Sequence, residues 1–68
     1  NKRKPLKIKI ESNDIKNIAY EKKLDNEDNI ITVASITNKL ALLIWFTYNG
    51  EENRDICLDA IKSIRIDD

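Results

Sequence analysis

The segment from Leu40 to Tyr48 constrains the fold more than any other stretch of the chain. It holds the only Trp, the only Phe and one of the two Tyr among 68 residues, and such a composition is typical of a β-strand. Alternation places one apolar set on one side of the strand, namely Leu40, Leu42, Ile44, Phe46 and Tyr48. The other side carries Ala41, Leu43 and Trp45. Because neither side suits water, we expect a central strand that is covered on both faces.

Two further segments have strand patterns. Residues Ile30 to Thr37 are β-branched at six of eight positions, and such side chains pack well on a pleated surface. Leu6 to Glu11 alternates apolar and charged residues after Pro5, which is typical of a half-exposed antiparallel strand. Asn38 and Lys39 predict a tight two-residue hairpin turn before the Leu40 strand.

The segment from Ile15 to Leu24 fits two structures. Ile18, Tyr20 and Leu24 share a face at a period of two, whereas helical spacing aligns another set, Ile15, Ile18, Ala19 and Lys22. We favour a strand, because a helix this short would present only about three apolar side chains. The alternative is one helix over residues 13–24. A polar loop is expected at Asp25–Asn29.

The last part of the chain changes its period. Arg54–Asp59 alternates, which predicts a strand with Ile56 and Leu58 inward and Cys57 outward. A 3₁₀ turn at Ala60–Lys62 would then join it to a short closing strand.

Together, these segments predict an all-β fold. We expect a small antiparallel barrel of five or six strands, SH3-like or Sm-like, with a charged lead-in at residues 1–5 and a single β domain at 6–68. The alternative is an α+β fold with the one helix at 13–24.

Composition sets further limits. Twelve basic residues balance twelve acidic ones, which argues against a surface dedicated to nucleic acid. There is no membrane-length apolar run, and the single cysteine allows no internal disulfide, so we expect a cytoplasmic protein without membrane contact. The chain starts with Asn1 and contains no Met, which suggests a trimmed chain or a module of a longer protein. The many Ile, Asn and Lys residues are typical of AT-rich coding, as in a low-GC bacterium, its phage or a similarly biased eukaryote.

Residues for catalysis or metal binding are sparse. No His is present to activate Cys57, and Asp55 and Asp59 beside it would raise the pKa of its thiol. The acidic loop Asp25–Asn29 lacks the Gly and the closing Glu of an EF-hand. We therefore expect no enzyme, no metal and no cofactor.

Two features indicate a binding role. A basic cluster at the start of the chain would suit contact with an anion or with nucleic-acid phosphates, and it comprises Lys2, Arg3, Lys4, Lys7 and Lys9. The alternative is that these residues bind nothing and form a solvated terminus and the exposed face of an edge strand. If one side of the Leu40 strand fills the barrel, then Ala41, Leu43 and Trp45 lie outside and form an interface with a protein partner or a second copy. The alternative is that the lead-in or the Ile15 segment covers them.

The run Trp45-Phe46-Thr47-Tyr48 and the segment Asn53–Ile64 resemble the latter half of a WYL domain. Positions that correspond to the family pattern are Arg54, Ile56, Leu58, Asp59, Ile61 and Ile64. Ala60 departs from the pattern, because the family usually has a basic residue there. The resemblance implies a non-enzymatic regulatory module that senses a ligand or nucleic acid, with Arg54 as an anion contact unless it pairs with Glu51 or Glu52. We therefore expect a non-catalytic binding or regulatory module; the alternatives are a phage-type inhibitor that masks a protein surface and a nucleic-acid-binding module with a basic terminus.

Overall fold

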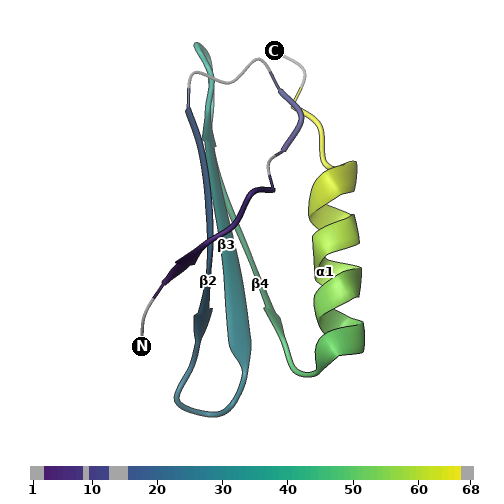
Figure 1. The fold of residues 1–68 in the computed structure, drawn as a ribbon. Coiled ribbons are helices and arrows are strands. Elements are labelled where there is room, and N and C mark those ends of the chain that lie inside the picture. Colours follow the sequence, from purple (N-terminus) through teal and green to yellow (C-terminus); the bar gives the residue numbers. More distant parts are fainter. Residues whose placement is uncertain (1–2, 9, 13–15, 67–68) are drawn as a thin grey trace.

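The fold is an open antiparallel sheet with one helix. The computed structural model describes residues 3–8, 10–12 and 16–66. The elements follow the chain in the order β1 (Lys4–Pro5), β2 (Lys16–Lys23), β3 (Asn29–Ile36), β4 (Ala41–Tyr48) and α1 (Glu51–Ser63). All strand pairs are antiparallel and the strand order is β1-β2-β3-β4 (Figure 1). Each strand therefore pairs with its neighbours in sequence.

The structure confirms that the segments predicted as strands β2, β3 and β4 are strands. The segment with two possible structures forms a strand at Lys16–Lys23, so the helix expected as an alternative over 13–24 is wrong for this part, and residues 13–15 lie outside the described residues. Asn38 and Lys39 form the predicted two-residue turn, in which the Thr37 amide donates to the Leu40 carbonyl at 2.8 Å. Each of these strands is eight residues long, and their register pairs them over their whole length.

The predicted barrel is wrong, because the last part of the chain is helical. The expected strand at Arg54–Asp59 and 3₁₀ turn at Ala60–Lys62 are instead one α-helix, Glu51–Ser63. Spacings of three and four join Leu58 to Ile61 and Cys57 to Ile61, so the apolar residues form a helical stripe. Two acidic residues in the first turn and Lys62 in the last turn suit the helix dipole. The helix covers one face of the sheet, and a sheet covered in this way has no need to close on itself.

The first strand also differs from its prediction. The strand expected at Leu6–Glu11 is absent from the described part of this range, and the strand lies earlier, at Lys4–Pro5. Pro5 is compatible with this position because β1 lies at the edge of the sheet. The following residues leave the sheet and reach the C-terminal segment, where the Ile66 amide donates to the Glu11 carbonyl at 3.0 Å. This crossing brings Leu6, Ile8 and Ile10 into the core.

The core lies between α1 and one face of the sheet, which we call the covered face. Its buried hydrophobic residues come from four parts of the chain, and they are Ile10, Ala19, Ile31, Val33, Cys57 and Ile61. The even-numbered residues of β4 from Leu42 to Tyr48 pack against this core. Ile56, which was expected to point inward, is 65% exposed, and Cys57, which was expected to point outward, is buried. A helix in place of a strand explains both reversals, because it turns the chain by about 100° per residue rather than 180°.

Candidate interaction surface

The other face of the sheet, which we call the open face, is apolar and uncovered. Figure 1 shows α1 on one side of the sheet only, and within the described ranges no helix or strand lies across the opposite side. Trp45 is 61% exposed and Leu43 is 59% exposed, and on β2 and β3 Ile18 and Ile36 are 45% and 42% exposed. The prediction that β4 is a central strand covered on both faces is therefore wrong: β4 is an edge strand with one bare face.

Strand register arranges the open face in rows. Tyr20, Thr32 and Trp45 lie side by side across β2, β3 and β4. The next row contains Ile18, Ala34 and Leu43, and beyond it Ile36 pairs with Ala41. Contiguous exposed apolar surface of this kind marks interaction sites in folded proteins.

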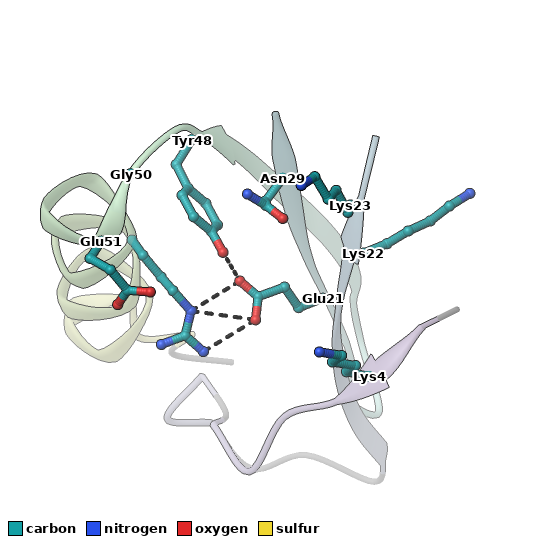
Figure 2. Close-up of a pocket in the computed structure, with 9 residues that line it drawn as sticks. Lys4, Glu21, Lys22, Lys23, Asn29, Tyr48, Gly50 and Glu51 are labelled. Atoms are coloured by element: carbon teal, nitrogen blue, oxygen red, sulfur yellow. Dashed lines mark hydrogen bonds and ion pairs between the residues drawn. The ribbon is translucent and has the colours of Figure 1, made fainter. Parts of the chain in front are cut away.

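Charge on the open face has one sign. The Arg3 guanidinium lies over the Tyr20 ring, 4.9 Å from its centroid. Lys16 and Lys22 share the parity of Tyr20 on β2 and lie at the two ends of that strand. Figure 2 shows the side chain of Lys22 pointing away from that of Glu21, which lies on the covered face. Across the described residues, every charged side chain that strand alternation places on this face is basic.

A second site lies at the edge of the covered face, where β2 and β4 meet the start of α1. It is a surface pocket of about 650 Å³, and its lining is Lys4, Glu21, Lys22, Lys23, Asn29, Tyr48, Gly50, Glu51 and Arg54 (Figure 2). Arg54 binds the Glu21 carboxylate through both Nε, at 3.0 Å, and Nη2, at 3.1 Å. The Tyr48 hydroxyl donates to the same carboxylate. The carboxylate in this pocket is thus already bound by two side chains of the chain itself.

These contacts shift the pKa values of Glu21 and Tyr48 in opposite directions. Burial raises the pKa of Glu21, but the hydrogen bonds from Arg54 and Tyr48 outweigh burial and hold that pKa below its usual value. Burial, together with the bond to the Glu21 carboxylate, raises the pKa of Tyr48 to about 12. Glu21 is therefore ionised and Tyr48 is protonated at neutral pH, which suits a structural ion pair.

The structure brings the predicted interface residues together and spreads the predicted basic cluster. Ala41, Leu43 and Trp45 share the open face, as expected for residues outside the core. Arg3 lies over this face, whereas Lys4 lies in the pocket on the other side of the sheet. Lys7 is exposed after β1, and Lys2 and Lys9 lie outside the described residues.

The ion-pair partner of Arg54 and the burial of Cys57 both differ from the predictions. Arg54 pairs with Glu21 on β2 rather than with Glu51 or Glu52, so its role as an anion contact stays a prediction. Burial raises the pKa of the Cys57 thiol, whereas the predicted cause was the neighbouring aspartates. In residues 3–8, 10–12 and 16–66, no three His, Cys, Asp or Glu side chains gather where they could hold a metal ion.

The contribution of β2 and β3 to the open face was not predicted from the sequence. Ile18 and Tyr20 already shared one side in the strand pattern that we favoured, which was the available signal. Their position beside Leu43 and Trp45 depends on strand order, which one segment does not specify. The pairing of Glu21 with Arg54 joins residues 33 positions apart, and no local pattern predicts it.

The helix α1 is not long and apolar enough to cross a membrane, and the described residues contain no other helix. Comparisons with protein-family models, curated proteins and solved structures gave no match.

Proposed function

We propose that the protein is a non-catalytic binding module that docks a partner protein on its open face. The observation that carries the proposal is the exposure of Leu43 and Trp45 beside Ile18 and Ile36 on one continuous surface. Covering Leu43 and Trp45 would remove on the order of 200 Å² of apolar surface from water, which is worth roughly 5 kcal/mol. That gain favours occupation of this face.

The charge of the open face indicates the chemistry of the partner. Arg3, Lys16 and Lys22 lie along the β2 side of the apolar rows, and no carboxylate shares the face within the described residues. A partner surface with an apolar centre and acidic residues at its rim would complement both features. Such a module masks or recruits another protein without performing chemistry on it.

The test compares binding by variants that change the open face with binding by a matched control. Trp45→Lys and Ile18→Lys place a charge on the open face, whereas Asp55→Lys places the same side chain on an exposed helical position. The experiment captures partners from cell lysate, identifies them by mass spectrometry and measures each affinity with purified protein. We expect Asp55→Lys to retain a partner that both open-face variants lose. Retention of that partner by folded Trp45→Lys would show that the open face is not the docking site, and so would the absence of any specific partner.

A second candidate function is binding of single-stranded nucleic acid. Tyr20 and Trp45 flank Thr32 in one row, and aromatic rings on a sheet with nearby cations can stack successive bases. The test is fluorescence titration with a short oligonucleotide. Binding that weakens steeply with salt and falls when Arg3, Lys16 and Lys22 are neutralised would favour this function. Absence of binding at low salt would exclude it.

A further inference from the structure

The two edges of the sheet differ in how they are protected. The β1 edge is two residues long and consists of Lys4 and Pro5, a charge and a residue that cannot donate to a ladder. The β4 edge is eight residues long, from Ala41 to Tyr48, and contains no charged residue, no Pro and no Gly. Within the described ranges no strand pairs with its outer side. Natural sheets usually protect such an edge, so an unprotected one indicates a strand that pairs with another chain.

The backbone groups at this edge follow from the hairpin. The Thr37 amide donates to the Leu40 carbonyl across the turn, so this pair is a hydrogen-bonded one. Antiparallel ladders alternate bonded and non-bonded pairs, which directs the backbone groups of every second residue of β4 away from β3. These residues are Ala41, Leu43, Trp45 and Thr47. Their N–H and C=O groups therefore face the free edge, while their side chains lie on the open face.

The outward groups of β4 are complementary to a second copy of themselves. An antiparallel pair centred on Ile44 places Leu43 opposite Trp45 of the second copy and Ala41 opposite Thr47 of the second copy. All four outward residues of each copy are then used, in about eight backbone hydrogen bonds. The new neighbours on the open face are an aliphatic and an aromatic side chain, a favourable cross-strand pair. No charge opposes another, because β4 has none.

An exposed apolar side chain of α1 is a second, independent observation that indicates pairing at the β4 edge. Cys57 points into the core, and Arg54, about 60° from it around the helix, reaches Glu21 on β2. Ile56 lies about 100° from Cys57 in the opposite direction, which directs it beyond β4. It lines a surface depression with Thr47 and Tyr48 at the end of that strand, and it is 65% exposed. An apolar side chain is thus exposed next to the unprotected backbone.

We propose that two copies of the chain pair through their β4 edges, about a two-fold axis at Ile44, into one continuous sheet. The two helices then lie on the same side of the sheet, and the Ile56 side chains add apolar contact beside the joined strands. Assembly stops at two copies, because both β4 edges are used and the opposite edges carry Pro5 in β1 and three lysines at the ends of β2, Lys16, Lys22 and Lys23. The two open faces become one larger face, so the dimer goes beyond the proposed docking function without depending on it.

The first test removes one outward donor. Leu43→Pro eliminates an N–H that points away from β3, so the β3–β4 ladder keeps its hydrogen bonds, while Leu43→Ala shortens the side chain and keeps the N–H. Sedimentation equilibrium should show a dimer for the wild type and for Leu43→Ala. Leu43→Pro should raise the dissociation constant at least about 100-fold, because one donor is lost in each copy. Circular dichroism at the same concentration checks that the variant is folded. A monomeric wild type at high concentration would overturn the proposal.

The second test needs no folded proline variant. Hydrogen exchange measured by NMR should show that the amides of Ala41, Leu43, Trp45 and Thr47 are protected, and that protection falls on dilution. Rapid exchange of these four amides at dimer concentrations would overturn the proposal even if Leu43→Pro were unfolded. Ile18→Lys separates this dimer from one in which open faces stack: it should leave the dissociation constant unchanged within about threefold, although it abolishes partner docking. Loss of the dimer in Ile18→Lys but not in Leu43→Pro would also overturn the edge pairing.

Discussion

The two faces of the sheet contrast within a single strand. Along β4 the exposed and half-buried residues alternate from Ala41 to Tyr48, so neighbouring side chains belong to different environments. Both sets are mainly apolar, and hydrophobicity alone does not distinguish them. The difference arises from the cover on one side, which α1 and the segment around Ile10 provide. A sheet needs cover on one face to fold, and its second face is then available for binding.

The largest expected effect is a difference in the free energy of unfolding between alanine variants of two isoleucines of β3. Ile31 is fully buried on the covered face, whereas Ile36 is 42% exposed on the open face. Ile31→Ala should lower the free energy of unfolding by about 3 kcal/mol, because it leaves a cavity among core residues. Ile36→Ala should lower it by less than about 1 kcal/mol. Urea denaturation of both variants at equal protein concentration checks this difference, and equal losses would contradict the assignment of the two faces.

The next effect concerns the ion pair at the edge of the covered face. The Glu21 side chain is 13% exposed and pairs with Arg54, while Lys23 and Glu27 form a pair whose side chains are 61% and 77% exposed. Glu21→Gln should lower the free energy of unfolding by about 2 kcal/mol, because it leaves the Arg54 charge partly buried without its partner. Lys23→Gln should change it by less than about 0.5 kcal/mol. Thermal or urea unfolding checks both.

The same carboxylate predicts an acid dependence with a definite sign. Because the folded-state pKa of Glu21 is lowered, its contribution to stability is present above the ordinary pKa, about 4.5, and is lost as pH falls through the folded value. Glu21→Gln should therefore flatten the acid limb of a plot of unfolding free energy against pH. An unchanged acid limb would mean that the pair with Arg54 does not form in solution.

The smallest expected effect is on the alkaline side. The pKa of Tyr48 is raised to about 12, so its contribution to stability is complete below its ordinary pKa of about 10 and is lost as pH rises toward 12. Tyr48→Phe should lower the free energy of unfolding at neutral pH by about 1 kcal/mol, the value of one hydrogen bond, and should reduce the alkaline loss. Urea denaturation at a series of pH values checks both. Identical alkaline slopes for the two proteins would contradict the contact with Glu21.

Local sequence patterns were sufficient to predict the meander of three strands. The β-branched run of β3, the turn at Asn38–Lys39 and the alternation of β4 are properties of neighbouring residues, and the structure places all three as expected. The helix was missed because Arg54–Asp59 also alternates, and a short segment can satisfy two periods. The sequence also contains two helix signals here: the spacing of four from Cys57 to Ile61 and the acidic residues after Gly50. The barrel followed from that error, since a strand at this place would have extended the sheet.

What the sequence determined by itself is where strands form and which side chains alternate, because backbone sterics and side-chain branching act between neighbours. It also placed Ala41, Leu43 and Trp45 on one side of β4. The tertiary structure decided which side would be covered, since that depends on where α1 and the chain around Ile10 pack. It also decided that Glu21 meets Arg54 and that β4 lies at an edge. These contacts join distant positions, and packing of the whole chain selects among several arrangements that satisfy the same local patterns.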